Sequence, residues 1–222
     1  LFKTTHFLRV DGKGAIWATD RGDMIAMQFD TQGKVLMTLG KKGVTGDNDS
    51  HDAFNGMADV AVAKNGDVFI ADGEGPNTRV AKFDKDGNFI KVWGKKGKGP
   101  GEFDIPHSLV FDAQGLLYVA DRSNQRIQVF DGDGNYIRET SHPGTPCGLF
   151  MTPDQTIWLA HGHTGQIMTL DLKGNVTGRM AGDGQGKTLG KYGEAHYIAV
   201  STRGEVFVAD TLNWRVQKYV KK

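Results

Sequence analysis

One structural unit recurs five times along the sequence, and this repetition limits the folds open to the chain. Its second strand is predicted in three close copies and two looser ones: Val68–Asp72, Leu117–Asp121, Val206–Asp210, Ile16–Asp20 and Ile157–His161. A third strand follows an Asn-x-Arg motif at Asn77–Arg79, Asn124–Arg126 and Asn213–Arg215. An Asp-x-x-Gly hairpin then leads to a fourth strand, since aspartate starts such turns and glycine accepts a positive φ. Each repeat therefore predicts four short strands.

Repeats of about 40–52 residues with four strands each predict an all-β fold, the β-propeller. A blade buries one of its faces only by stacking on the next blade, so the array is expected to form a ring. A solenoid or a β-sandwich is the alternative, but neither requires a near-constant four-strand period. The 31 glycines among 222 residues, about twice the usual frequency, supply the turns between strands.

The repeats predict one propeller domain over residues 1–222 with five visible blades. The last repeat stops at Tyr219–Lys222, before the hairpin and fourth strand that the other repeats contain. We therefore expect a six-bladed ring whose N-terminal blade is absent from this chain.

Composition narrows the classes of partner. The chain has 27 Lys and Arg against 26 Asp and Glu, a net charge of +1, which predicts neither nucleic acid nor an anionic membrane as a partner. No apolar stretch approaches the length of about 20 residues that a membrane span needs. The single cysteine cannot form an internal disulfide, and the oligomeric state stays open.

Histidine gathers in one column of the repeat alignment. At a fixed distance before the first-turn glycine, the five repeats carry these residues: His6, Ala58, His107, Cys147 and His196. This position starts the innermost strand of each blade, so its side chains are expected to converge on the central channel. In a six-bladed ring the three histidines would occupy alternate blades, about 120° apart. Three imidazoles with an open fourth position predict a catalytic zinc site.

The alternative for these histidines is hydrogen bonding along a wet channel. Cys147 shares the column but is interpreted as a small buried filler rather than a fourth ligand. A second column follows the second strand and contains Arg21 and Arg122, whose guanidinium groups can bind a substrate carboxylate. For Arg21, a solvated loop charge is an equal alternative. We interpret Arg79, Arg126 and Arg215 as structural pairs between blades.

Two sets of motifs carry a resemblance to known families. The Asn-x-Arg-[Ile/Val] strands that end in Phe or Tyr resemble NHL repeats over essentially the whole chain. The segments Phe103–Leu109 and Val119–Phe130 resemble the lyase domain of peptidylglycine α-amidating enzymes. That family implies a six-bladed propeller with a central zinc on three histidines, which cleaves peptidyl-α-hydroxyglycine into a peptide amide and glyoxylate.

The resemblance implies roles for individual residues. His6, His107 and His196 become zinc ligands, and Arg122 becomes the arginine beside the hydroxyl and carboxylate of a small-molecule or peptide substrate. The resemblance also implies a periplasmic or secreted protein. Where the family has a catalytic tyrosine this chain has Glu74, which is a candidate general base near zinc and would suit an ester or lactone hydrolase.

Two further alternatives stay open. A non-catalytic NHL propeller that binds a protein or glycan partner has the same fold, because fold does not dictate function. The polar loop 43–56 is longer than its counterparts and could cover a site or, with its acidic residues, hold Ca²⁺. We predict a zinc-dependent, lyase-like enzyme, with Ca²⁺ as a doubtful second ion.

Overall fold

A computed structural model of the chain describes residues 1–142, 144–181 and 184–220, which form five antiparallel sheets. The first sheet contains β1 (Thr5–Val10), β2 (Ile16–Asp20), β3 (Ile25–Phe29) and β4 (Val35–Leu39). The second contains β5 (Met57–Val62), β6 (Val68–Asp72), β7 (Arg79–Phe83) and β8 (Phe89–Trp93). The third contains β9 (Pro106–Phe111), β10 (Leu117–Asp121), β11 (Arg126–Phe130) and β12 (Tyr136–Ser141). The fourth contains β13 (Pro146–Met151), β14 (Ile157–His161), β15 (Ile167–Leu170) and β16 (Val176–Ala181). The fifth contains β17 (Ala195–Val200), β18 (Val206–Asp210) and β19 (Arg215–Tyr219).

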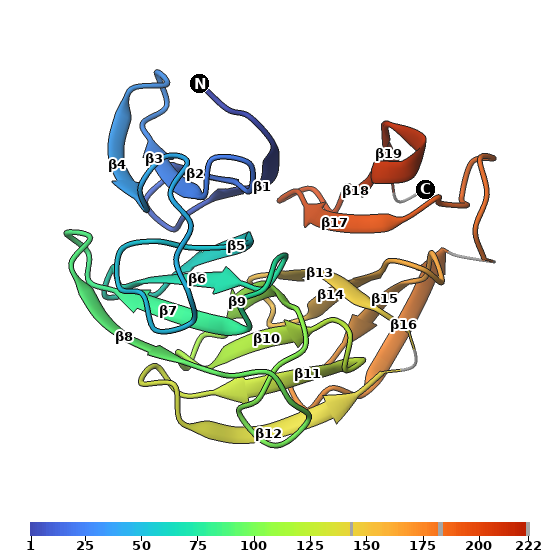
Figure 1. Cartoon of the computed structure of the whole chain (residues 1–222). Helices are drawn as coiled ribbons and strands as arrows, with labels where there is room; N and C mark the ends of the chain where they lie inside the picture. The colour runs from blue at the N-terminus through green and yellow to red at the C-terminus, as the bar shows by residue number, and fades with distance from the viewer. Residues whose placement is uncertain (143, 182–183, 221–222) are drawn as a thin grey trace.

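The sheets are arranged as blades around a common centre, with β1, β5, β9, β13 and β17 innermost (Figure 1). Within each blade consecutive strands are neighbours, so the chain runs outward from the centre and then begins the next blade. The predicted all-β propeller with five visible blades is confirmed. The fifth blade has three strands, as the incomplete last repeat indicated.

The hydrophobic core lies between successive blades. One buried cluster joins the first and second sheets through Trp17, Phe54 and Ile70, and another joins the second and third through Phe69 and Leu109. Similar clusters lie between the remaining neighbours. Because the second and third sheets are covered on both faces, β6, β7, β10 and β11 are buried at every residue.

The hairpins between third and fourth strands form as the sequence predicts. Asp84 and Asp131 begin such turns, and Gly87 and Gly134 close them with N–H donated to the aspartate carbonyl at 3.0 Å. These glycines have φ of 86° and 79°, in the left-handed region that side chains disfavour.

The arginines of the Asn-x-Arg motif make pairs within a blade, so our expectation of pairs between blades was wrong. Arg79 on β7 donates to Asp72 on the adjacent β6 at 2.9 Å, and its other nitrogens bind backbone carbonyls of the loop that enters the blade. Arg126 and Arg215 repeat the arrangement with Asp121 and Asp210. The motif therefore fixes the entry loop of its own blade.

The ring is open between the first and last sheets. Side chains of β1 and of β17–β19 line a groove of about 540 Å³ between them. Leu8, Val10 and Val216 on these sheets are 65%, 60% and 65% exposed, although equivalent positions inside the ring are covered. The described residues therefore leave an apolar space between the blades at the two ends of the array.

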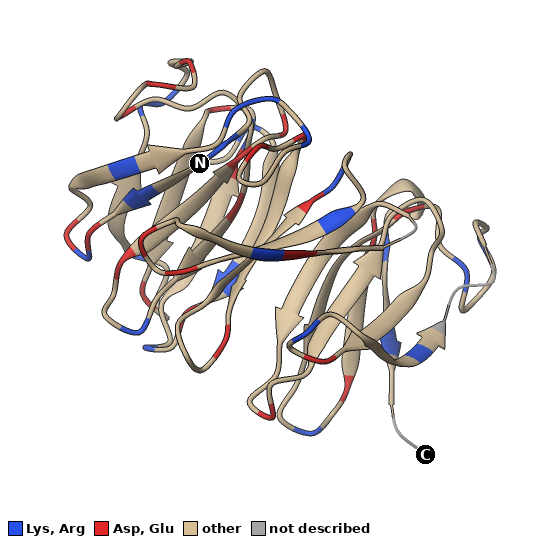
Figure 2. Ribbon diagram, turned by 90° about the horizontal axis from the view of Figure 1, so that it is seen from below, with Lys and Arg blue, Asp and Glu red and all other residues tan. Residues whose placement is uncertain are grey.

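Basic and acidic residues are interspersed along the ribbon, with neither sign gathered on one side (Figure 2). The absence of a nucleic-acid partner stays a prediction. Among the described residues no helix is long and apolar enough to cross a membrane. The helical element there is the short 3₁₀ turn Thr211–Asn213.

His161 is a buried histidine outside the central column. It ends β14, where the other blades have aspartate, and it is fully buried next to the buried His142 at a ring-centroid distance of 6.2 Å. Neither ring nitrogen of His161 has a hydrogen-bond partner among the described residues. Burial, followed by the nearby His142 and Arg179, lowers the pKa of His161 to about 4.

This buried histidine predicts acid sensitivity. An unfolded chain binds a proton at His161 below its ordinary pKa of 6.5, whereas the folded chain binds it only near 4. Stability is therefore present above pH 6.5 and is lost as the pH falls toward 4, by about 2 kcal/mol at pH 5. Urea unfolding of metal-free protein at pH 8 and pH 5 measures this loss, and His161→Gln is expected to make the pH dependence shallower. An unchanged dependence in the variant would contradict the assignment.

Candidate metal centre

The histidine column coincides with a β-bulge at the start of every innermost strand. In β1, Thr5 pairs with Asp20 and Phe7 with Thr19, so His6 is the extra residue of the ladder. The same single-residue shift isolates the other members of the column: Ala58, His107, Cys147 and His196. A bulge turns its extra residue away from the regular alternation of a strand. In this propeller the bulges aim the column residues at the centre.

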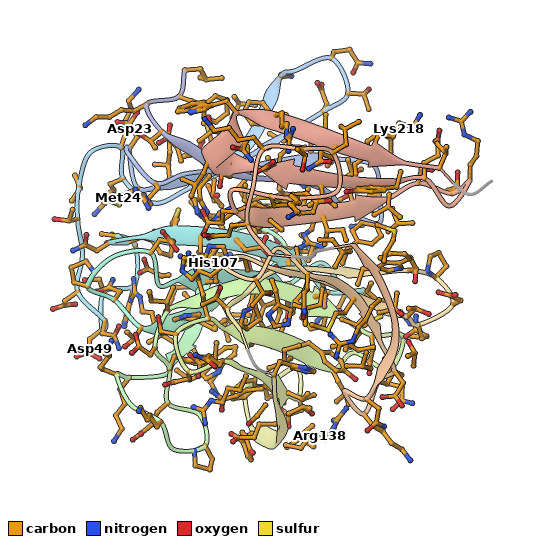
Figure 3. All side chains as sticks on the ribbon, turned by 90° about the vertical axis from the view of Figure 1, so that its right-hand side faces the viewer. Asp23, Met24, Asp49, His107, Arg138 and Lys218 are labelled. Atoms are coloured by element: carbon orange, nitrogen blue, oxygen red, sulfur yellow. The ribbon has the colours of Figure 1, made fainter. Side chains whose placement is uncertain are left out.

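The three histidines meet there. Their ring centroids are 5.2 Å (His6 to His107), 5.1 Å (His6 to His196) and 4.8 Å (His107 to His196) apart, which is nearly an equilateral triangle. One nitrogen from each ring lies within 4.8 Å of the others, close enough to share one ion. His107 lies in the middle of the molecule, while Asp49, Arg138 and Lys218 lie at its edge (Figure 3). The role of His6, His107 and His196 as zinc ligands stays a prediction.

Backbone carbonyls orient two of the three rings. Nδ1 of His6 lies 2.8 Å from the carbonyl of Ala58, and Nδ1 of His107 lies 2.7 Å from that of Cys147. A carbonyl only accepts, so each Nδ1 carries the proton and each Nε2 keeps its lone pair in a neutral ring. Each carbonyl belongs to the column residue of the next blade. This is the outer-shell contact that metal-binding histidines ordinarily make.

Two of the three rings are kept neutral. Burial, followed by the neighbouring His107, lowers the pKa of His6 to about 4 and that of His196 to about 2. Neutral imidazole is the form that binds metal. Nε2 of His107 is also buried without a hydrogen-bond partner among the described residues. The trio therefore fits a divalent transition metal.

Glu74 lies against this trio, held by two arginines. Arg21 donates to its Oε2 at 2.7 Å and Arg122 to its Oε1 at 2.9 Å. Oε1 is 3.2 Å from Nε2 of His107, and Oε2 is 4.0 Å from Nε2 of His6. Burial raises the pKa of Glu74, but His107, His6 and Arg122 together hold it well below its usual range. The structure thus brings all six predicted site residues together.

Two glycines fix the backbone that carries Glu74. The amides of Gly73 and Glu74 both donate to the carbonyl of Gly56, at 2.9 and 2.8 Å. A Cβ at Gly56 would lie 2.2 Å from the nitrogen of Gly75, and a Cβ at Gly75 would lie 2.0 Å from the carbonyl oxygen of Asn55. Only glycine allows this approach of two backbone segments.

The sequence patterns did not single out two residues of the site, Glu194 and Tyr197. Glu194 accepts from Arg122 at 2.7 Å, so this arginine bridges two carboxylates. The hydroxyl of Tyr197 lies 3.1 Å from Nδ1 of His6, and its ring stacks on His107. Burial, and then the charge of Asp59, raises the pKa of Tyr197, so the hydroxyl stays neutral. The only available signal was their closeness in sequence to His196.

Cys147 is buried and free, as a small filler would be. Burial raises the pKa of its thiol to about 11. Its sulfur, however, also lies within 4.8 Å of ligand atoms of Glu194 and His196, which makes a second cluster that could hold a metal. The two clusters share His196.

The loop 43–56 packs along the second blade, and its last residue, Gly56, accepts from the amide of Glu74. Arg79 binds the carbonyls of Asn48 and Ala53, and the side chain of Asn48 donates to the carbonyl of Gly94. Among the described residues, the acids of this loop do not take part in either cluster of potential metal ligands. The doubtful Ca²⁺ site stays untested.

Residues 54–175, more than half of the chain, match the family described as "6-bladed beta-propeller". The chain belongs to this family. The propeller is also similar to proteins whose names indicate activity. A Caenorhabditis elegans protein named "Probable peptidyl-alpha-hydroxyglycine alpha-amidating lyase pgal-1" is 40% identical over 128 residues, which are 56% of this chain and 36% of that protein. The human "NHL repeat-containing protein 3" is 34% identical over 115 residues, 50% of this chain and 33% of that protein.

The propeller thus spans about a third of the length of these two curated relatives, and the resemblance to amidating lyases and NHL proteins is confirmed. A solved structure described as "Streptogramin B lyase structure" has a TM-score of 0.67 at 18% identity, covering 98% of this chain and 69% of that one. A gluconolactonase from Xanthomonas campestris has a TM-score of 0.66 at 18% identity, covering 93% of this chain and 69% of that one. At this identity both show the fold alone.

Proposed function

We propose that this chain is part of a zinc-dependent lyase that cleaves peptidyl-α-hydroxyglycine or a related α-hydroxy compound. The carrying observation is the convergence of three imidazoles on one point, with ligand nitrogens within 4.8 Å. Similarity to proteins named as α-amidating lyases, at 40% identity for one of them, supports the reaction class.

The histidines and the charged residues of the site would have different roles. His6, His107 and His196 would hold the zinc, which when bound supplies a Lewis acid that polarises a substrate oxygen. The charges of Arg21 and Arg122 cancel those of Glu74 and Glu194 across their contacts. A divalent cation therefore leaves the centre positive, and this favours a substrate with an anionic end.

Arg122 is the group placed to bind that anionic end. Its side chain is 16% exposed, and its two terminal nitrogens already hold carboxylates at 2.9 and 2.7 Å. A planar guanidinium binds a carboxylate through two parallel hydrogen bonds. The substrate carboxylate would replace one of the internal carboxylates on this fork.

Arg122→Ala is expected to lower kcat/KM for glyoxylate release about 10- to 100-fold, because a hydrogen bond to a charged group contributes about 1.5–3 kcal/mol. The assay follows glyoxylate from a peptidyl-α-hydroxyglycine with the complete protein. Arg203→Ala, at a side chain that is 80% exposed, serves as the control and should not change the rate. Equal rates in the two variants would contradict the role of Arg122.

An ester or lactone hydrolase is the second candidate and would use Glu74 as a general base. A base works best when its pKa lies near the working pH. Because the pKa of Glu74 is held well below its usual range, its carboxylate accepts a proton poorly. The lyase therefore comes first. Lactone turnover without glyoxylate would reverse this order, and purified protein without any metal would favour a non-catalytic propeller.

A further inference from the structure

We propose that Glu74 is a fourth protein ligand of the metal, so that the resting centre consists of three imidazoles and one carboxylate. This inference rests on the proposed function only in assuming that the His6, His107 and His196 trio binds a metal. It changes the role of Glu74 from a proton acceptor to a residue that occupies the position facing the histidines.

The spacing between Glu74 and His107 is that of two ligands on one ion. Oε1 of Glu74 lies 3.2 Å from Nε2 of His107. Zinc binds imidazole nitrogen and carboxylate oxygen at about 2.0–2.2 Å in a tetrahedron, which separates neighbouring ligand atoms by about 3.3–3.5 Å. The observed distance agrees with this edge length before any adjustment of side chains.

The buried Nε2 of His107 faces Glu74. The other ring nitrogen, Nδ1, is already bound to the Cys147 carbonyl at 2.7 Å. Nε2 lies 3.2 Å from Oε1 of Glu74, yet it is fully buried and lacks a hydrogen-bond partner among the described residues. A metal ion between the two groups would bind both atoms.

Glu74 is positioned as a ligating carboxylate usually is. Its backbone is fixed on the carbonyl of Gly56, and each of its oxygens accepts a hydrogen bond, from Arg21 at 2.7 Å and from Arg122 at 2.9 Å. Ligating carboxylates are ordinarily held by such outer contacts. Of the two acids that Arg122 binds, Glu74 lies beside His6 and His107, whereas Glu194 belongs to the second cluster with Cys147 and His196.

A donor set of three nitrogens and one oxygen has a chemical consequence. It suits zinc and other first-row divalent ions such as cobalt or iron, rather than a thiolate-preferring ion. A substrate oxygen would then reach the metal by displacing Glu74 or by adding a fifth ligand. A substrate carboxylate that binds Arg122 would break one of the two arginine hydrogen bonds that hold Glu74.

The test is metal affinity, measured for wild type, Glu74→Gln and Glu74→Asp by competition with a chromophoric chelator. Glu74→Gln is expected to weaken zinc binding by at least about tenfold, and clearly more than Glu194→Gln, which removes the same charge from the other carboxylate on Arg122. Glu74→Asp keeps the charge but moves the oxygens, so it should also weaken binding. Circular dichroism verifies the fold of each variant.

Cobalt(II) substitution gives an independent reading, because its visible spectrum reports coordination number and ligand type. The proposal expects the spectrum to change in Glu74→Gln and to be preserved in Glu194→Gln, without a thiolate charge-transfer band. Wild-type affinity and spectrum in Glu74→Gln would overturn it, and so would wild-type affinity in Glu74→Asp, which would show a role of charge alone.

Other results would overturn the proposal and would also show whether the proposed function still stands. A thiolate band that disappears in Cys147→Ser, with weaker binding in Glu194→Gln, would place the metal on the second cluster. Wild-type protein that binds no metal would remove the proposed function as well. If zinc binding is lost in His6→Ala but zinc affinity is unchanged in Glu74→Gln, the role of Glu74 is overturned and the proposed function stands.

Discussion

His107→Ala is expected to lower zinc affinity by about 100-fold or more, the upper range found even for loss of an outer-shell partner. His107 is the fully buried member of the trio, and its ring lies about equally far from the other two, at 5.2 and 4.8 Å. Removing it takes away one of the three imidazoles and the ligand nitrogen that lies 3.2 Å from Oε1 of Glu74. Elemental analysis after dialysis against a weak chelator measures the loss.

Thermal unfolding provides a second measurement on the same variant. Zinc at 100 times its Kd would stabilise the wild type by about 2.7 kcal/mol, and the variant should gain much less at that concentration. His51→Ala is the control, because His51 stacks on Phe89 at 4.0 Å, outside the metal centre. Stoichiometric zinc in His107→Ala would remove the basis of the metal site.

Arg79→Ala is expected to destabilise the protein by about 3–5 kcal/mol, because removing one partner leaves a buried charge uncompensated. Arg79 and Asp72 are both 0% exposed and are paired at 2.9 Å. The same guanidinium also binds loop carbonyls of Asn48 and Ala53, whose hydrogen bonds would be lost. Urea unfolding measures the effect.

The repeat provides the matched control for this prediction. Arg215→Ala removes the equivalent arginine from the last blade, where the side chain is 27% exposed and water can replace part of what is lost. Its cost should be clearly smaller than that of Arg79→Ala. Equal costs would show that burial of the pair does not determine its contribution. Asp72→Asn combined with Arg79→Ala should restore part of the stability by removing the unpaired charge.

The blade pattern could be predicted because each of its signals is local. Asp-x-x-Gly turns, Ala-Asp strand ends and alternating apolar runs act within a few residues of one another, and five copies reinforce one interpretation. The column of His6, His107 and His196 was visible for the same reason, since equivalent residues of a repeat occupy equivalent places. The bulges that point these side chains inward have no signature in the sequence of a single blade.

Features that depend on the path of loops were not predictable from the repeat. Glu74 meets Arg21 and Arg122 because three separate blades bring their loops to the centre. Its position depends on the approach of Gly56 and Gly75, which are far apart in sequence. The burial of His161 was missed because a histidine replaces the usual aspartate there, and only the surrounding blades decide its exposure.

The contacts of the histidine rings with the next blade have a consequence for how such a centre can change over time. Ala58 and Cys147 contribute peptide oxygens to the orientation of His6 and His107, and a peptide oxygen is present whatever the side chain. The orientation of the two imidazoles therefore does not depend on which side chain these positions carry. Because both side chains are buried, a substitution there is limited by the space available and not by the hydrogen bonds to the rings.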